Sequence, residues 1–408
     1  MWRRIVCLLL CGAISVWPVA ADGGQVLYDE GAGESLDSLL AEDETVWPAM
    51  AVPTDAEGLD IRAKGAVLMD LGSGTVLYEQ KAREHLPIAS VTKVMTLLLV
   101  MEALEQGRIA WTDPVACSAE AAALGGSQIW LEPGEIMTVE ELVKAAVVVS
   151  ANDACAALGE YVSGSLSAFV AMMNQRAAEL GMGDTQFKDC SGLDDSGYSC
   201  AYDVALMSRE LMTHREIERF TTIWTDSLRG GESQLVNTNK LVRHYDGATG
   251  LKTGTTNAAG HCLTATARRE GTAFVAVVLG CATTAERWAG ARTLLDYGFA
   301  NYTAYTPPME SLELSPIRVL NGQQTQVPVV PDTAETLLLK KGTEGQVEMT
   351  FELAEDLQAP VYAGQTVGVW RLMLGEEILG EYAVRAAADI PAVTLRWAYH
   401  LLVEALLA

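Results

Sequence analysis

The chain has 408 residues, of which 50% are hydrophobic and 20% are charged. This composition can bury sizeable cores, and a chain of this length usually divides into more than one domain. The 53 acidic and 28 basic side chains give a formal net charge of -25, which argues against nucleic acid or an anionic surface as a general partner. The five histidines are isolated, and the spacings H-E-x-x-H and C-x-x-C do not occur, so we expect neither a metal site nor a cofactor.

The N-terminus has the features of an export signal. Two arginines precede an apolar core over residues 5–16, and small residues up to Ala21 form a cleavage site. We therefore expect residues 1–21 to be a signal peptide that directs the protein out of the bacterial cytoplasm, while lipidation at Cys11 is a weaker alternative. Residues 22–60 carry roughly eleven acids and no lysine or arginine, a composition typical of a flexible acidic extension.

A serine and a lysine, Ser90-x-x-Lys93, open an apolar segment over residues 87–100. Proline followed by an apolar run predicts a turn that enters a buried helix. The spacing places both side chains on one helical face, and the helix N-terminus offers unpaired N–H groups where an oxyanion would form. A lysine in such apolar surroundings can have a lowered pKa and act as a base. The alternative is a serine that caps a core helix and a lysine that extends out of it.

A second polar signature, Ser150-x-Asn152, lies between two apolar segments. Residues 140–149 are typical of a helix with acids in its first turn, and helical spacing resumes at Ala154. A hydroxyl and an amide between two buried helices could relay a proton and hold a substrate carbonyl. An ordinary helix cap explains the triplet equally well.

A third signature, Lys252-Thr253-Gly254, begins a set of β-branched segments. Residues 251–256 lead into two strand-like segments, 262–268 and 272–279, with a turn between them, which predicts an antiparallel hairpin. The edge of this hairpin can accept an extended peptide as a further strand. The glycine allows a substrate backbone to approach closely, while the lysine and threonine offer a cation and a hydroxyl to its carboxylate. The alternative is a strand that carries a solvated lysine.

The C-terminal quarter has a different pattern. Short alternating runs separated by turns predict a small all-β domain over residues 309–387. Residues 390–408 then form a helical run with one narrow polar stripe, and its length of roughly 27 Å is short of a ~30 Å hydrocarbon core. We expect this run to be an amphipathic anchor on the membrane surface, with a packing helix or a spanning helix as alternatives. The polar stripe consists of Arg396, His400 and Glu404.

Most of the eight cysteines are expected to be buried small side chains. Two of them lie in residues 1–21, and the other six are scattered through the chain. Cys190 and Cys200 flank one loop, so a disulfide between them remains open, because proximity in sequence does not establish the geometry.

Taken in order, the three signatures and the segments around them resemble the D-alanyl-D-alanine carboxypeptidases, the low-molecular-mass penicillin-binding proteins. The resemblance covers roughly residues 60–300 and is carried by residues 87–96, 150–155 and 250–255. It implies an α/β (α+β) fold of the penicillin-binding and β-lactamase-like transpeptidase type over residues 61–304. The strand-rich segment that follows resembles the small C-terminal all-β domain of this family less specifically.

The resemblance also implies roles for the matched residues. Ser90 would attack the carbonyl of the penultimate D-alanine of a peptidoglycan stem peptide, and Lys93 would accept its proton. Ser150 would relay a proton to the departing D-alanine, water would hydrolyse the acyl-enzyme, and β-lactams would be covalent inhibitors. Asn152 would hold the substrate amide, and Lys252 and Thr253, with Gly254 beside them, would bind the terminal carboxylate. The backbone N–H groups of Ser90 and Thr255 would form the oxyanion hole. Arg287, just before the last helix of the domain, would help to attract the carboxylate.

One segment departs from the family, and two other functions compete. Family members commonly have a histidine after the Gly-Leu-Asp segment, where this chain has Gly197 and a loop expected to be one residue shorter, so its hydrogen bonds to the site cannot be transferred. A β-lactamase would need an E-x-x-L-N segment, and residues 232–237 are one residue too long and too close to Lys252. A non-catalytic penicillin-binding wall protein is disfavoured because Ser90 and Lys93 are both retained.

Overall fold

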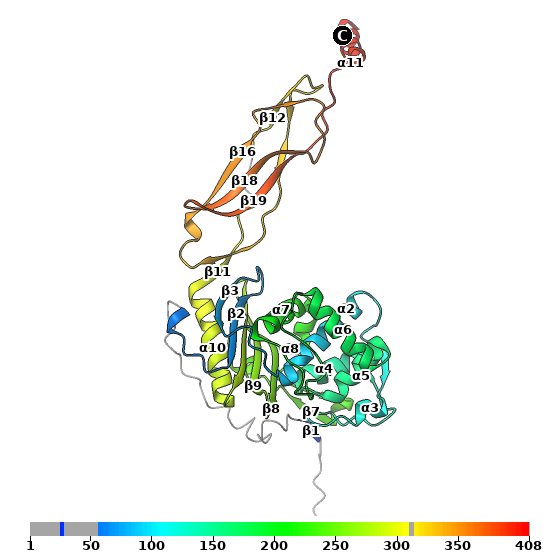
Figure 1. The fold of residues 1–408 in the computed structure, drawn as a ribbon. Coiled ribbons are helices and arrows are strands. Elements are labelled where there is room, and N and C mark those ends of the chain that lie inside the picture. The colour runs from blue at the N-terminus through cyan, green and yellow to red at the C-terminus, as the bar shows by residue number, and fades with distance from the viewer. Residues whose placement is uncertain (1–24, 28–55, 310–313, 408) are drawn as a thin grey trace, which may run out of the picture.

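The computed structural model describes residues 25–27, 56–309 and 314–407. In Figure 1 a body of helices around a central sheet, formed mainly by residues 56–301, carries an elongated body of strands. A single helix, α11, stands at the far end of the strands. This architecture agrees with the expected mixed fold followed by a small all-β domain.

The centre of the first body is a five-stranded antiparallel sheet with the order β3-β2-β10-β9-β8. Every residue of β2 is buried, and β9 and β10 are buried over most of their length, because helices cover both faces of the sheet. The expected hairpin is confirmed, and β8 forms an exposed edge of the sheet. The strands are β2 (Gly65–Asp70), β3 (Val76–Gln80), β8 (Ala248–Thr256), β9 (Gly260–Arg269) and β10 (Thr272–Cys281).

Two apolar cores lie on the two faces of this sheet. On one face α10 (Thr284–Asn301) packs through Leu294 and Leu295 against side chains such as Phe274. On the other face α2 (Lys93–Glu105) and α7 (Ala201–Leu211) belong to a larger core built by the helical lobe. The other helices of this lobe are α3 (Ala119–Ala122), α4 (Val139–Val148), α5 (Asn152–Ser163), α6 (Leu166–Glu179), α8 (Glu218–Thr221) and α9 (Leu241–His244), with 3-10 turns at η4 (Ala89–Thr92), η5 (Arg215–Ile217) and η6 (Arg229–Gly231).

Two small sheets and one further turn complete this body. The strands β4 (Pro114–Ala116) and β5 (Ile136–Thr138) pair with each other, as do β6 (Thr225–Leu228) and β7 (Ser233–Val236). The strand β1 (Gln25–Leu27) pairs in parallel with β7, and a 3-10 turn, η3, covers Ala56–Gly58. Parts of the segment 22–60 therefore have regular structure, which the expectation of a flexible extension did not include, while residues 28–55 and the expected signal peptide lie outside the described residues.

The C-terminal strands have a core of their own. A four-stranded antiparallel sheet with the order β14-β19-β18-β16 is accompanied by the three strands β13-β12-β17. The strand β15 (Leu337–Lys340) instead pairs with β11 (Tyr302–Tyr305), so it joins the end of the first body to the second. The remaining strands are β12 (Ile317–Leu320), β13 (Gln326–Val327), β14 (Val329–Pro331), β16 (Val347–Leu353), β17 (Asp356–Gln358), β18 (Thr366–Leu374) and β19 (Glu377–Ala386), with a 3-10 turn, η8, at Glu344–Gln346.

The C-terminal helix is shorter than expected. The run expected from residue 390 becomes helical only in α11 (Leu395–Leu407), because Ala392 still bridges to Gly322 and Val393 donates its N–H to Asn321. His400 and Glu404 form an ion pair of 3.2 Å along the predicted polar stripe. Within residues 56–309 and 314–407, no single helix is long and apolar enough to cross a bilayer, although the pair α5 and α6, bent by 83°, meets the length and composition together.

The six cysteines outside the expected signal peptide are all buried free thiols. The sequence did not decide whether Cys190 and Cys200 form a disulfide. Both are free thiols in the described structure, so this disulfide is absent there. Burial raises the pKa of the Cys117 thiol to about 11 and that of Cys200 to about 12, so the thiols are neutral and inert at physiological pH. Their role is packing.

Trp370 is the largest fully buried side chain of the β-domain, and we predict that its truncation unfolds this domain. It stacks on Tyr382 at 4.7 Å, lies 6.1 Å from Phe351 and donates its indole N–H to the Asp332 carbonyl at 3.1 Å. Trp370→Ala should lower the free energy of unfolding of the β-domain by about 3–5 kcal/mol in urea denaturation. Tyr362→Ala, at a side chain 63% exposed, is the matched control and should change it by less than about 0.5 kcal/mol. A loss below about 1 kcal/mol in Trp370→Ala would contradict the prediction.

Candidate active site

Ser90 lies in a tight turn rather than in the first turn of a regular α-helix. The 3-10 turn η4 contains it, and α2 begins only at Lys93. Ala89, directly before the serine, has a φ of +47°, a left-handed conformation that costs a residue with a Cβ on the order of 1–3 kcal/mol. Such strain persists only where the surrounding structure imposes it.

Lys93 and Ser90 are in direct contact, as their spacing predicts. The Lys93 Nζ donates a hydrogen bond to Ser90 Oγ at 2.8 Å and another to the Ser191 carbonyl at 2.9 Å. The lysine is 0% exposed while the serine is partly exposed. A nucleophile that substrate can reach is therefore paired with an amine that bulk water cannot reach, which is the arrangement an activated serine needs.

Ser150 and Asn152 occupy the break between α4 and α5. Ser150 has a φ of +63°, and its buried Oγ makes no hydrogen bond within the described residues. The Asn152 side chain donates to the Gly125 carbonyl at 2.7 Å, but its Oδ1 is also buried and lacks a partner there. Buried polar atoms without partners are uncommon and costly, so both oxygens are available to a ligand or to water.

Asp153, the residue after Asn152, fixes the loop that faces this break. Its carboxylate accepts the backbone N–H of Ile129 at 3.2 Å and of Leu131 at 3.0 Å. Burial raises the pKa of the Asp153 carboxyl, and the backbone N–H groups partly oppose that rise. The sequence showed this acid beside the second signature, but only the fold shows that it anchors residues 129–131.

The third signature lies on the edge strand β8. Lys252 is 1% exposed and donates to the Thr253 carbonyl at 3.0 Å, while the Thr253 hydroxyl donates to Thr238 Oγ1 at 2.8 Å. The alternative of a solvated lysine is therefore wrong. A buried ammonium next to an open strand edge is suited to hold an anionic group of a strand-like ligand.

Gly254 faces the nucleophile turn. A Cβ at this position would lie 2.7 Å from the Ile88 carbonyl oxygen and 3.0 Å from the backbone nitrogen of Ser90. We expected this glycine to make room for a substrate backbone. The described geometry shows that its missing side chain lets β8 lie directly against η4, which brings the edge strand within reach of the nucleophile.

Arg287 approaches Thr255 from α10. The expected position just before this helix is wrong, because a capping box between Thr283 and Glu286 starts the helix earlier and places Arg287 in its first turn. The guanidinium donates to Thr255 Oγ1 at 3.2 Å and lies 4.4 Å from the Trp288 ring centroid. His261 Nδ1 is 3.4 Å from the same hydroxyl, a contact that follows from the register of β8 and β9 and that the sequence analysis missed.

Comparison with known proteins identifies the group to which this geometry belongs. Residues 50–283 match the peptidase family described as D-alanyl-D-alanine carboxypeptidase, and residues 310–392 match the C-terminal domain of penicillin-binding protein 5. The chain belongs to the D-alanyl-D-alanine carboxypeptidase family. It is a serine peptidase and a penicillin-binding protein, and the β-lactamase and the non-catalytic wall protein are not favoured.

Individual relatives of this carboxypeptidase cover most of its length. It is 40% identical to the D-alanyl-D-alanine carboxypeptidase DacF of Bacillus subtilis, over 80% of this chain and 86% of the relative. Penicillin-binding protein 5 from Haemophilus influenzae has a similar structure, with a TM-score of 0.70 and 29% identity over 84% of this chain and all of that one. Penicillin-binding protein D2 from Listeria monocytogenes, solved in an ampicillin-bound form, matches 59% of this chain and 99% of that one, with a TM-score of 0.52 and 33% identity.

Two acidic groups of the carboxypeptidase have ligand atoms close enough together to hold a metal ion, but cations of the protein already pair with both. Arg176 bridges Glu102 and Glu210 at 2.7 Å each, next to His214. In the second group, formed by Asp184, Cys200 and Asp203, Asp184 pairs with Arg83 at 3.3 Å. Neither group belongs to the Ser90 site, so neither takes part in the proposed mechanism.

We predict that Gly254→Ala slows acylation without unfolding the carboxypeptidase. The added methyl group must displace the Ile88 carbonyl or the Ser90 turn by a few tenths of an ångström, and small misplacements of reacting groups cost on the order of 10²-fold in rate. The rate of covalent labelling by a fluorescent penicillin measures this loss. Gly183→Ala is the matched control, since its Cβ would meet nothing within 4 Å. An unchanged labelling rate in Gly254→Ala would show that the close approach is unimportant.

Proposed function

We propose that this chain removes the terminal D-alanine from peptidoglycan stem pentapeptides through an acyl-enzyme on Ser90. The observation that carries the proposal is the 2.8 Å contact between the hydroxyl of the partly exposed Ser90 and the buried Lys93 amine, within a chain of this peptidase family. Lys93 accepts the serine proton as Oγ attacks the carbonyl of the penultimate D-alanine. The backbone N–H groups of Ser90 and Thr255 stabilise the resulting oxyanion, and the contact of Gly254 with η4 brings these two residues near each other.

Collapse of the tetrahedral intermediate releases D-alanine and needs a proton at the leaving amine. Ser150 is suited to relay that proton, because its hydroxyl is buried and has no hydrogen-bond partner among the residues that the structure describes. Asn152 Oδ1, also without a described partner, accepts the substrate amide N–H. Water then attacks the acyl-enzyme and regenerates Ser90.

The edge of β8 supplies the binding surface for the substrate. The stem peptide lies along this edge as an added strand, and its terminal carboxylate meets Lys252 and Thr253. Arg287 supports that end of the strand through its bond to the Thr255 hydroxyl and adds positive charge. Because penicillin-binding protein D2 binds ampicillin with a similar structure, we expect β-lactams to acylate Ser90 in the same position.

The site of action follows from the two ends of the chain. Residues 1–21 have the sequence of a signal peptide, so the enzyme works outside the cytoplasm. At the other end, α11 exposes most of its apolar side chains, among them Leu395 at 93% and Leu406 at 77%. The helix lies at the tip of the β-domain, far from the sheet that carries the site, so anchoring it in the membrane surface leaves the catalytic body free to face the wall (Figure 1).

We predict that Ser90 is the residue that penicillin labels and that D-alanine release depends on. Penicillin should add its mass to the peptide that contains Ser90, and a pentapeptide ending in D-Ala-D-Ala should yield free D-alanine. Ser90→Ala should abolish both results, because it removes the hydroxyl that contacts the Lys93 amine at 2.8 Å and that serves as the nucleophile. Ser167→Ala, at an exposed serine on α6, is the control and should retain both. Labelling that survives in Ser90→Ala would overturn the mechanism.

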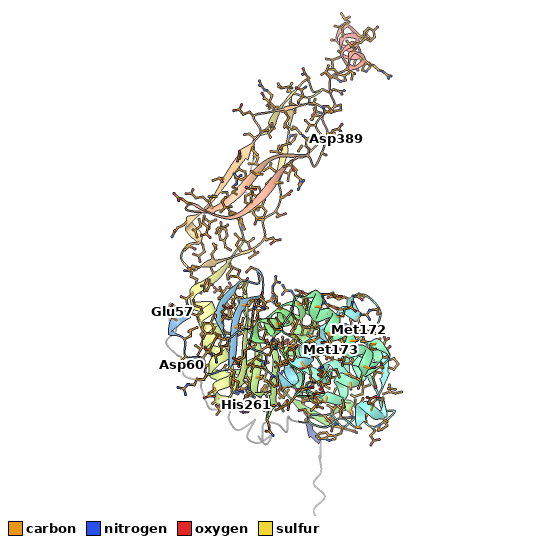
Figure 2. The ribbon with its side chains drawn as sticks, in the orientation of Figure 1. Glu57, Asp60, Met172, Met173, His261 and Asp389 are labelled. Atoms are coloured by element: carbon orange, nitrogen blue, oxygen red, sulfur yellow. The ribbon has the colours of Figure 1, made fainter. Side chains whose placement is uncertain are left out.

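We also predict that truncation after Asp389 releases active enzyme from membranes. Asp389 lies near the distal end of the β-domain, so the truncation removes α11 and leaves the catalytic body intact (Figure 2). Fractionation of cells should find the full chain with membranes and the truncated chain in the soluble fraction, with equal penicillin labelling per molecule. If the truncated chain still sediments with membranes, another segment provides the attachment.

A further inference from the structure

The loop that contains Ser191 and Gly192 lies directly against the nucleophile turn. Its Ser191 carbonyl accepts the hydrogen bond from Lys93 Nζ at 2.9 Å. Gly192, with a φ of +83°, packs its backbone directly on that of the nucleophile turn. The closeness is such that a Cβ on Gly192 would lie 1.9 Å from the Ala89 carbonyl oxygen. Two consecutive residues of this loop therefore touch the base and the strained residue that precedes the nucleophile.

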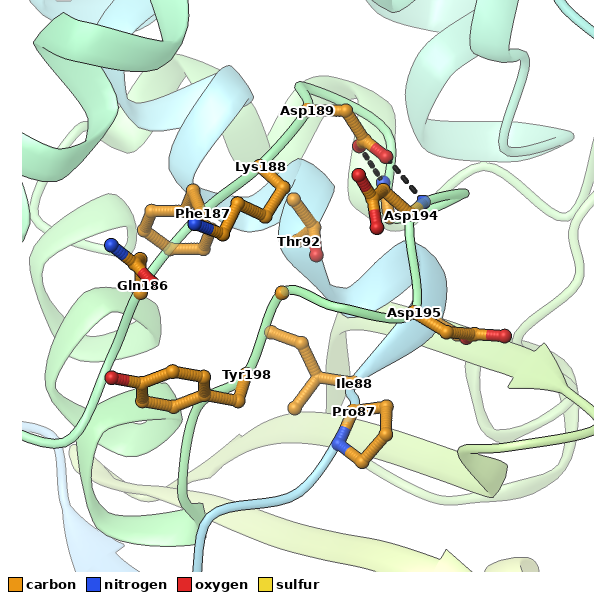
Figure 3. Close-up of a pocket in the computed structure, with 13 residues that line it drawn as sticks. Pro87, Ile88, Thr92, Gln186, Phe187, Lys188, Asp189, Asp194, Asp195 and Tyr198 are labelled. Carbon is orange, nitrogen blue, oxygen red and sulfur yellow. Dashed lines mark hydrogen bonds between the residues drawn. The ribbon is translucent and has the colours of Figure 1, made fainter.

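Apolar packing holds the start of this loop but not its outer part. Cys190 is buried in the larger apolar core, whereas the residues at the outer part of the loop, Leu193 to Ser196, are exposed. A small hollow, open to solvent, lies between the loop and the segment that enters the nucleophile turn (Figure 3). Between the buried start and the exposed tip, hydrogen bonds therefore help to determine where the Ser191 carbonyl lies.

The carboxylate of Asp189 supplies those hydrogen bonds. It accepts the backbone N–H groups of Ser191 at 2.6 Å, of Gly192 at a short distance and of Asp194 at 2.5 Å. Figure 3 shows the side chain turned inward over the loop, with its bonds to the backbone on the far side of the turn. Hydrogen bonds to an ionised acceptor are roughly twice as strong as neutral ones, so three of them fix the path of residues 189–194.

Other bonds connect this loop to the rest of the site. The Thr96 hydroxyl of α2 donates to the Cys190 carbonyl at 2.6 Å, one residue before Ser191. The Asp195 carboxylate accepts from the hydroxyl of Thr256 on β8 at 2.7 Å. The loop is thus tied at its two ends to the helix of the base and to the substrate-binding strand, and Asp189 sets the shape of the turn between them.

We propose that Asp189 is a positioning residue for the general base. By fixing the N–H groups of Ser191 and Gly192, it holds the Ser191 carbonyl against Lys93 Nζ. One N–H of the neutral amine is then directed to that carbonyl, and its lone pair is directed to Ser90 Oγ, whose proton it takes as the Oγ–carbonyl carbon bond forms. Asp189 touches neither substrate nor the reacting atoms, and the inference rests on the proposed function.

The experiment separates hydrogen bonding from charge with two substitutions at one site. Asp189→Ala removes both acceptor oxygens and with them every hydrogen bond that the carboxylate accepts from residues 191–194. Asp189→Asn keeps one oxygen for the N–H groups of Ser191 and Gly192, removes the charge and loses the bond to Asp194. Asp194→Ala is the matched control, since the Asp194 carboxylate bonds only to the backbone and hydroxyl of Ser196 in the described contacts. Stopped-flow labelling with a fluorescent penicillin gives the encounter Kd and the acylation rate constant for each folded protein, and thermal melting reports stability.

We expect Asp189→Ala to lower the acylation rate constant about 30- to 100-fold with an encounter Kd within threefold of the wild type, since misplaced reacting groups lose on the order of 10²-fold. Asp189→Asn should recover to within about fivefold, and Asp194→Ala should stay within twofold.

Three results overturn the inference. The first is an acylation rate constant in Asp189→Ala within threefold of the wild type. The second is an equal loss of the acylation rate constant in Asp189→Ala and Asp189→Asn. The third is a weaker encounter Kd together with a lower melting temperature that account for the slower labelling. Absence of labelling in the wild type would instead refute the proposed function itself.

Discussion

The burial of Lys93 is the constraint on which the rest of the site depends. Moving an ammonium group from water into a protein core costs several kcal/mol unless polar partners compensate it. The first residue of α2 is nevertheless 0% exposed, and its described partners include the Ser90 hydroxyl and the Ser191 carbonyl. Two segments that are far apart in the chain, the continuous stretch of η4 and α2 and the loop at Ser191, must therefore meet at one nitrogen atom.

Two residues of the site have strained backbone conformations. Ala89 and Ser150 have positive φ values although both carry a Cβ, and each immediately precedes or belongs to a signature of the site. Gly192 and Gly254 give a complementary effect, because each allows one backbone to lie against the nucleophile turn where a side chain would collide. The packing of the two apolar cores around the sheet holds these conformations, so stability elsewhere maintains the strained geometry at the site.

The residues of the active site all lie in the catalytic body, and the β-domain is a separate body with its own core. The catalytic body has its cores on the two faces of one sheet, whereas the β-domain has an independent core around Trp370. The pairing of β11 with β15 joins the two bodies, because β11 directly follows α10, the last helix of the catalytic body. Such an arrangement lets the tip of the β-domain meet a surface while the edge strand β8 stays open to an extended substrate.

The sequence by itself determined the local parts of this protein. The three-residue spacing placed Lys93 next to Ser90, although the serine lies in the 3-10 turn before the helix. Alternation and turn residues located the hairpin of β9 and β10, and the change of pattern near residue 308 indicated the β-domain. These features depend on neighbours within a few residues, which a period or a turn residue reveals.

The tertiary structure alone decided the long-range contacts: Gly254 against the Ser90 turn, Arg287 from α10 on the Thr255 hydroxyl, and Asp189 shaping the loop whose carbonyl meets Lys93. It also decided that Cys190 and Cys200 stay unpaired and that β15 pairs with β11. Each of these contacts joins residues on separate elements, and no local pattern encodes it, because the packing of the whole core determines which surfaces meet.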